Sequence, residues 1–145
     1  MDQLNNSENE IHKIALKRSH TINKKLEKTR IKELHSELQL VGSKDDILTH
    51  LKGGPSKNLI NAFFKTQHTC DYCGIEKSKS IQLDRAHCNK DECDRVSLLK
   101  IAINHHFINE LTPIKINSIL RTFIKLHNDI PLFTLCKKCH QTYDK

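Results

Sequence analysis

Hydrophobic residues recur at helical spacing along the first forty residues of the chain. A Ser-x-x-Glu sequence, the form of a capping box, precedes them at residues 7–10. The apolar positions that follow are Ile11, Ile14, Ala15, Ile22, Leu26, Leu34 and Leu38. This pattern predicts a helix, or two helices broken near residues 19–21, from about residue 8 to about residue 40, with Gly42 as its C-terminal cap.

Two shorter helical patterns come next. Ser43 opens a helix that reaches about Leu51, and the Gly-Gly-Pro sequence at residues 53–55 ends it. Ser56 is positioned to cap a third helix. The apolar residues of that helix cover one face, which we expect to lie in the core: Leu59, Ile60, Phe63 and Phe64.

The second half of the chain alternates between strand and helix patterns. Residues 79–87 predict a strand that ends at His87, and residues 131–135 predict a second strand. Two helices between them, at about 92–109 and from Thr112 to about 127, are expected to supply much of the core. A terminal helix is expected to begin within residues 139–144. The fold class predicted is therefore α+β and mostly helical.

Four of the six cysteines form two C-x-x-C pairs, Cys70 with Cys73 and Cys136 with Cys139. Four thiolates satisfy tetrahedral zinc and leave no open position, so the pairs predict one structural zinc site. The 62 residues between Cys73 and Cys136 exceed the spacing of a simple zinc ribbon, which requires a folded segment between the two pairs. A redox role competes, but no βαβ pattern surrounds either pair. Cys88 and Cys93 are interpreted as free thiols in preference to a second metal pair.

Charge and composition refine this picture. The 145 residues are 37% hydrophobic and 5% aromatic, so a bound metal would help to stabilise the fold. The net charge is +7, and between Ile11 and Lys32 eight cations accompany one acid. A polyanion is the expected partner, and the first helix is interpreted as a helix that contacts the DNA backbone, with a solvated surface helix or a coiled-coil arm as alternatives. No signal peptide or long apolar run is present, which predicts a soluble, intracellular protein without membrane contact.

The order of motifs resembles that of the HNH family of metal-dependent nucleases, which have a ββα-metal fold. The likeness rests on the first C-x-x-C pair, the sequence Arg85-Ala86-His87, and the segment Leu135 to His140 followed by Tyr143-Asp144. It covers roughly the second half of the chain. It implies two regions: a basic helical N-terminal region at residues 1–66 and an HNH-like domain at residues 67–145, with a helical insertion at about 92–128.

The resemblance also implies roles for particular residues. His87 would be the general base that activates water, and Asn128 lies nearest to the position of the family's asparagine, where this chain has Pro131. His140 would hold a catalytic Mg²⁺ or Mn²⁺ together with Asp144 or Asp84, because Ala86 stands where many relatives have a metal ligand. Such a site would also accept Zn²⁺ or Ni²⁺. Double-stranded DNA is the expected partner, and the basic residues predicted to hold it, most of them on the first helix and outside the resemblance, are Lys17, Arg18, Lys24, Lys25, Lys28 and Arg85.

Each of these residues also has a structural interpretation. His140 could complete a zinc shell, His87 could be a further zinc ligand or a buried histidine, and Asp84 could pair with Arg85. The leading hypothesis is an endonuclease that hydrolyses DNA phosphodiester bonds, as a monomer or homodimer. The alternatives are a non-catalytic zinc-stapled module that binds nucleic acid, and an interaction protein that dimerises through its N-terminal helix.

Overall fold

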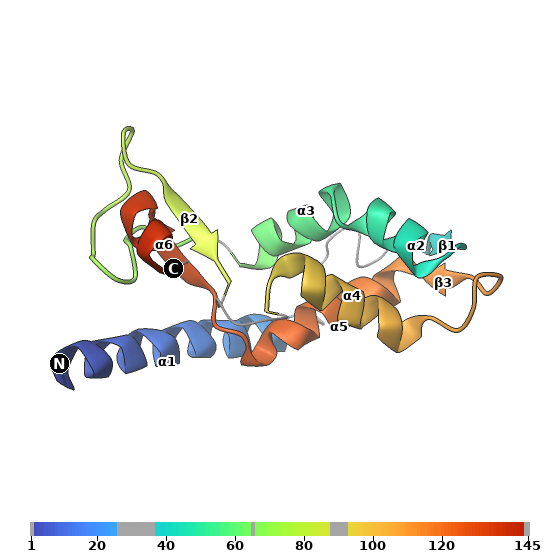
Figure 1. Cartoon of the computed structure of the whole chain (residues 1–145), viewed down its shortest axis with the longest axis horizontal. Helices are drawn as coiled ribbons and strands as arrows, with labels where there is room; N and C mark the ends of the chain where they lie inside the picture. The colour runs from blue at the N-terminus through green and yellow to red at the C-terminus, as the bar shows by residue number, and fades with distance from the viewer. Residues whose placement is uncertain (1, 26–36, 65, 88–92, 144–145) are drawn as a thin grey trace.

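The computed structural model describes residues 2–25, 37–64, 66–87 and 93–143, without the side chains of residues 2–9 and 22–25. Within these ranges the chain is α+β, with six α-helices, a 3₁₀ turn (η2, His127–Asp129) and two two-stranded sheets. The elements divide between two ends of an elongated molecule (Figure 1). None of the helices described is long and apolar enough to cross a lipid bilayer.

One end is a helical body made of four helices, α2 (Lys44–Leu51), α3 (Gly54–Phe63), α4 (Arg95–His106) and α5 (Ile116–Leu126). The predicted capping residue Ser43 accepts a hydrogen bond from the Asp46 amide at 3.1 Å, and the Asp46 carboxylate accepts one from the Ser43 amide at 3.2 Å. Ser56 is buried inside α3, and the N-cap is Gly53 instead. The four helices share a core that includes Leu51, Leu59, Ile60, Leu99, Ala102, Ile119, Leu120, Phe123 and Ile124, all fully buried.

A small two-stranded sheet lies at the far end of the helical body. Because of this sheet, two predicted helix boundaries are wrong. Strand β1 (Gln39–Leu40) pairs antiparallel with β3 (Ile114–Lys115). The first helix therefore does not extend to residue 40, and Gly42 follows a strand, with φ at +149°. The helix predicted to start at Thr112 starts at Ile116, because residues 114–115 are in the sheet and the Ile116 amide donates to Leu38 O at 3.1 Å.

The other end carries the second sheet and the last helix. Strands β2 (Leu83–Ala86) and β4 (Phe133–Cys136) pair antiparallel, with Leu83 opposite Cys136 and Ala86 opposite Phe133. Helix α6 (Lys137–Tyr143) follows β4 directly. Both predicted strands and the terminal helix are confirmed, and α4 and α5 lie between the strands in the chain as expected. A second, smaller core joins Ala15, Cys70, Leu83, Ala86, Phe133, Leu135 and Cys136.

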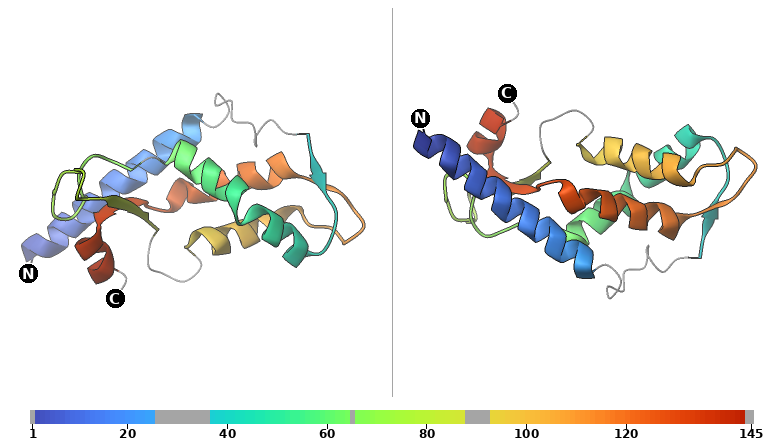
Figure 2. Two further views of the ribbon diagram at one scale, coloured as in Figure 1. Left: turned by 90° about the horizontal axis from the view of Figure 1, so that it is seen from above. Right: turned by 90° about the horizontal axis from the view of Figure 1, so that it is seen from below.

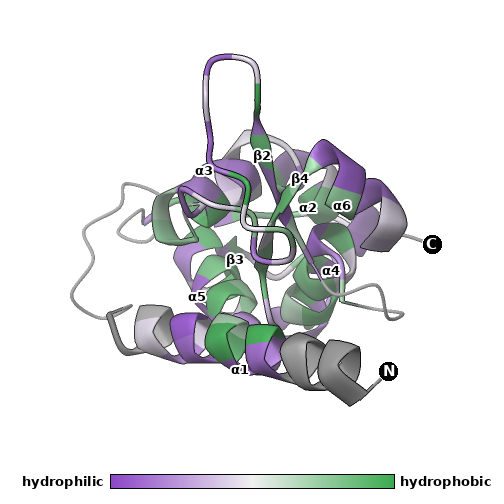
Figure 3. Ribbon diagram, turned by 90° about the vertical axis from the view of Figure 1, so that its left-hand side faces the viewer, coloured by the Kyte–Doolittle hydropathy of each residue, from purple (hydrophilic) through white to green (hydrophobic). Residues whose placement is uncertain are grey.

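Helix α1 (Asp2–Lys25) runs along the side of the molecule, past the β2–β4 end and toward the helical body (Figure 2). Ala15 is fully buried in the second core, and the Ser19 hydroxyl donates to Ile130 O at 2.8 Å. In Figure 3, which views the molecule from the β2–β4 end, hydrophilic residues colour much of α6. Of the α1 side chains that the structure describes, two are buried, Ala15 and Ser19.

Asp71, which lies between Cys70 and Cys73, ties α1 to β4. Its Oδ2 accepts hydrogen bonds from Arg18 Nη2 at 2.8 Å and from the Thr134 amide at 2.7 Å. The Asp71 amide in turn donates to Thr134 O at 2.8 Å. The Asp71 carboxylate therefore joins the turn that holds Cys70 and Cys73 to both β4 and α1.

Candidate functional site

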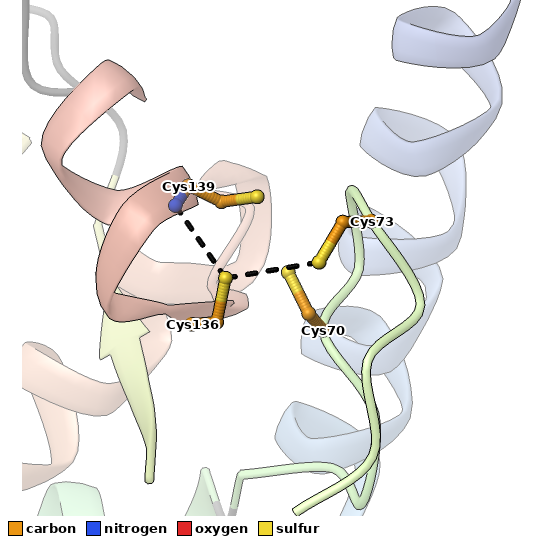
Figure 4. A group of neighbouring side chains, drawn as sticks. All are labelled: Cys70, Cys73, Cys136 and Cys139. Carbon is orange, nitrogen blue, oxygen red and sulfur yellow. Dashed lines mark hydrogen bonds between the residues drawn. The ribbon is translucent and has the colours of Figure 1, made fainter. Parts of the chain in front are cut away.

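The four cysteines of the two C-x-x-C pairs converge on one point (Figure 4). Their sulfur atoms all lie within 4.8 Å of one another, and Cys73 Sγ is 3.7 Å from Cys136 Sγ. Four sulfurs placed tetrahedrally at about 2.3 Å from zinc would be separated by about 3.8 Å. The spacing of the thiols thus fits a zinc ion. Among the described residues this is the one group of three or more histidine, cysteine, aspartate or glutamate side chains that could hold a metal ion.

A tight turn presents the first pair. The Gly74 amide donates to Cys70 O at 3.0 Å, and the Cys70 amide donates to Ile75 O at 2.9 Å. Gly74 has φ at +77°, in the left-handed region where a side chain would add strain.

The strand–helix junction presents the second pair. Cys136 is the last residue of β4, opposite Leu83, and Cys139 lies in the first turn of α6. The Cys139 amide points at Cys136 Sγ, at 3.5 Å. Because Cys70 and Cys136 are 2% and 8% exposed, whereas Cys73 is exposed and Cys139 is intermediate, the site is closed on the core side.

The thiols have unequal acidities in the absence of a cation. Burial tends to raise the pKa of Cys70, but hydrogen bonds from the backbone of Cys73, Cys136 and Tyr72 outweigh it and lower the pKa to about 7. Burial and the neighbouring thiols raise the pKa of Cys139 far above its usual range. Four adjacent thiolates repel one another, so a divalent cation is the group that would allow all of them to ionise.

Two predicted metal ligands meet beside this centre. His140 lies in α6 and Asp84 lies in β2, and His140 Nδ1 is 3.5 Å from Asp84 Oδ2. The side chains are 30% and 54% exposed, respectively. They can therefore be reached from solvent, unlike the sulfurs of Cys70 and Cys136. Asp144 lies outside the described residues.

His87 follows β2 directly and contacts a second histidine. His87 Nε2 is 3.2 Å from His127 Nε2, and His127 is fully buried. Burial, followed by the charge of Arg85, lowers the pKa of His87 to about 4. Burial, followed by the neighbouring His87, lowers the pKa of His127 to about 3. Both rings are therefore neutral at pH 7.

Asn128 and two of the predicted DNA-binding cations have contacts within the chain. Asn128 Nδ2 reaches Asp129 Oδ1 at 3.4 Å. Arg18 is paired with Asp71, and their side chains are only 24% and 14% exposed. Arg85 donates to Asn61 Oδ1 at 2.8 Å and to Phe64 O at 3.1 Å, and these hydrogen bonds attach β2 to α3. Arg85 thus has partners in α3 and at the C-terminal end of that helix, while the neighbouring Asp84 contacts His140.

The remaining predicted residues are described to different extents. Lys17 is exposed on α1. Lys24 and Lys25 are in the last turn of α1 with side chains outside the description, and Lys28 lies outside the described residues. Cys93 is disulfide-bonded, so its interpretation as a free thiol is wrong.

Sequence reasoning missed two residues of this region, Asp71 and His127. Asp71 gives no signal in the sequence, because its partners Arg18 and Thr134 are distant in the chain. His127 could have been noticed, because it follows Phe123 by four residues and so lies on the apolar face of α5.

Comparisons of the chain with known protein families, with curated proteins and with solved structures found no match.

Proposed function

We propose that the chain is a metal-dependent endonuclease of the HNH type that cleaves DNA. The observation that carries the proposal is the arrangement of β2, β4 and α6 around the four cysteines. In this unit Asp84 and His140 lie 3.5 Å apart, and His87 follows the same strand as Asp84. A strand pair and a helix that offer a histidine–carboxylate pair and a second, neutral histidine match the ligand and base that phosphodiester hydrolysis requires.

The roles of the chain's own groups follow from their protonation states and exposure. His87 is neutral at pH 7 and half-buried, so it can accept the proton of an attacking water through a ring nitrogen. Asp84 and His140 would hold a Mg²⁺ or Mn²⁺ ion through one carboxylate oxygen and one imidazole nitrogen. When bound, such an ion would offset the charge that develops on the phosphate and the leaving oxygen. The four cysteines would hold zinc and fix the strand pair against α6.

The charge distribution supports duplex DNA as the substrate. The chain carries 24 lysine and arginine residues against 17 acids, and Lys13 and Lys17 are exposed on α1. Each lysine placed on a phosphate releases counterions, so this helix would bind the DNA backbone without reading its sequence. Arg18 and Arg85 instead stabilise the fold, through Asp71 and Asn61.

A nicking assay on supercoiled plasmid tests the proposal. Zinc-loaded protein should nick the plasmid with Mg²⁺ or Mn²⁺, and both His87→Ala and His140→Ala should lower the rate at least about a hundredfold. Lys57→Ala, a change of an exposed lysine in α3, is a matched control and should keep the wild-type rate. Cleavage that His87→Ala leaves unchanged would remove His87 as the base.

A non-catalytic zinc-stapled module that binds nucleic acid is the second candidate. It is favoured by the partners of the candidate catalytic groups, since His87 is hydrogen-bonded to the buried His127 and Asn128 reaches only its neighbour among the contacts described. This candidate predicts salt-dependent DNA binding by a protein that nicks no plasmid with any divalent metal. The nicking assay and a binding titration together separate the two candidates.

A further inference from the structure

His127 is a buried histidine with a polar partner on each ring nitrogen. Its Nδ1 is 2.8 Å from Phe123 O, and its Nε2 is 3.2 Å from His87 Nε2. The rings of Phe123 and Phe64 pack against it, with centroids 4.9 Å and 5.2 Å away. The imidazole is therefore fixed in orientation as well as enclosed.

The carbonyl of Phe123 determines which nitrogen of His127 carries the proton. A carbonyl oxygen can only accept, so His127 Nδ1 must donate. In a neutral imidazole the other nitrogen is then an acceptor, which makes His127 Nε2 the acceptor for His87. The contact at 3.2 Å then requires His87 Nε2 to be the donor. The lone pair of a neutral His87 lies on Nδ1.

We infer that His127 is a positioning residue that holds His87 in its Nε2-protonated tautomer and leaves Nδ1 as the basic nitrogen. In terms of the proposed nuclease, on which the catalytic consequence rests, Nδ1 of His87 is the atom that takes the proton from water. His127 acts through His87 and touches no substrate. The anchor is rigid because it belongs to the helical body, at the junction of α5 and η2.

The charged groups around the pair favour the neutral forms of both rings. Arg85 and Arg95 lower the pKa of His87 and Asp94 raises it, but burial is the largest effect. The carbonyl of Phe123 raises the pKa of His127, against burial, His87 and Arg85. A pair that stays neutral keeps one shared proton, which is the condition for a defined tautomer.

Nitrogen NMR on the full, zinc-loaded chain with ¹⁵N-labelled histidine tests the tautomers without reference to catalysis. We expect the protonated nitrogen to be Nε2 in His87 and Nδ1 in His127, with a coupling between the two Nε2 atoms through the hydrogen bond. His127→Phe keeps an aromatic ring but has neither polar group, so the coupling should vanish. His106→Phe, which removes a histidine bonded to Thr122, should leave the coupling intact.

Kinetics of the same variants test the positioning role. His127→Phe should lower kcat about tenfold to a hundredfold without changing the Kd for DNA, because a misoriented base loses part of the factor that general-base catalysis supplies. His127→Gln should recover part of kcat, because its amide can donate to Phe123 O and accept from His87. Circular dichroism and zinc content confirm that each variant is folded.

Several results would overturn the inference. Absence of the coupling in the wild type would do so, as would a second zinc per chain that His127→Phe removes, since both Nε2 atoms would then be metal ligands. A wild-type kcat in folded His127→Phe, where His87→Ala is inactive, would remove the positioning role. If the wild type nicks no DNA, the proposed nuclease fails, and the NMR measurement alone decides the tautomer.

Discussion

Replacing Arg18 by methionine should destabilise the fold, whereas the same change at the neighbouring Lys17 should not. Arg18 Nη2 and the Thr134 amide both donate to Asp71 Oδ2, at 2.8 Å and 2.7 Å. The Arg18 and Asp71 side chains are 24% and 14% exposed. Arg18→Met therefore leaves a poorly solvated carboxylate with one donor fewer, while keeping most of the side-chain volume.

The expected cost is about 2–3 kcal/mol of unfolding free energy. A hydrogen bond to a charged group contributes about 1.5–3 kcal/mol, and removing one partner of a fully buried ion pair costs about 3–5 kcal/mol. Because the Arg18–Asp71 pair is partly exposed, the expected cost lies in the lower of these two ranges. Lys17 is exposed, so Lys17→Met should change stability by about 0.5 kcal/mol or less.

Urea unfolding at saturating zinc, followed by circular dichroism, measures both variants without the screening that an ionic denaturant would add. A double-mutant cycle with Asp71→Asn should give a coupling of about 1–2 kcal/mol between residues 18 and 71. DNA binding should respond to the other residue. Lys17→Met should reduce the slope of log K against log salt concentration by about 1, whereas Arg18→Met should leave this slope unchanged. Equal stabilities of the two single variants would refute the structural role of Arg18.

Three further predictions concern acid, metal and the candidate ligands. The pKa values of His87 and His127 are depressed in the folded chain, to about 4 and about 3. Between pH 6.5 and 4 the unfolded chain therefore binds more protons than the folded chain. The contribution of the two buried histidines to the free energy of unfolding is complete above pH 6.5 and declines as the pH falls. Unfolding titrations at pH 7 and 5 should show a loss of about 4 kcal/mol, about 2 for each histidine at about 1.4 kcal/mol per pH unit below 6.5, and about half of that loss should remain in His127→Phe; equal losses would contradict the cause given. Removal of zinc by a chelator should unfold the β2–β4 end and expose Cys70 and Cys136 to a thiol reagent, whereas thiols that stay protected after metal removal would argue against a structural ion. Asp84→Asn should abolish metal-dependent nicking yet keep the zinc content, because Asp84 is exposed and bonded to His140; loss of zinc in that variant would make Asp84 part of the structural site.

Local patterns were sufficient to predict much of the fold. Ser43 as the start of a helix, the alternation before His87 and the amphipathic residues of α5 are each patterns of a few residues, and they predict β2, β4 and most helix positions, although the capping box predicted at residues 7–10 lies inside α1. The convergence of the two C-x-x-C pairs on one site was also predictable, because four thiols satisfy one tetrahedral ion.

Features that depend on distant contacts were not predictable in this way. Strands β1 and β3 have two residues each, too few to show an alternation, and they exist because they pair across the end of the helical body. The same pairing moves the start of α5 and changes the role of Gly42. The partners of Arg18 and His87 likewise come from segments far along the chain, so charge and motif could indicate what these residues are but not what they contact.

X-ray absorption at the zinc edge, combined with the metal content of the purified chain, tests most directly the claim that the four cysteines hold one ion without His140 as a ligand. The structure predicts one zinc per chain with four sulfur ligands at about 2.3 Å and no nitrogen ligand. The spectrum should be unchanged in His140→Ala. A chain without zinc, or a shell of three sulfurs and one nitrogen that changes in His140→Ala, would contradict the division between the structural cysteines and the proposed catalytic pair of Asp84 and His140.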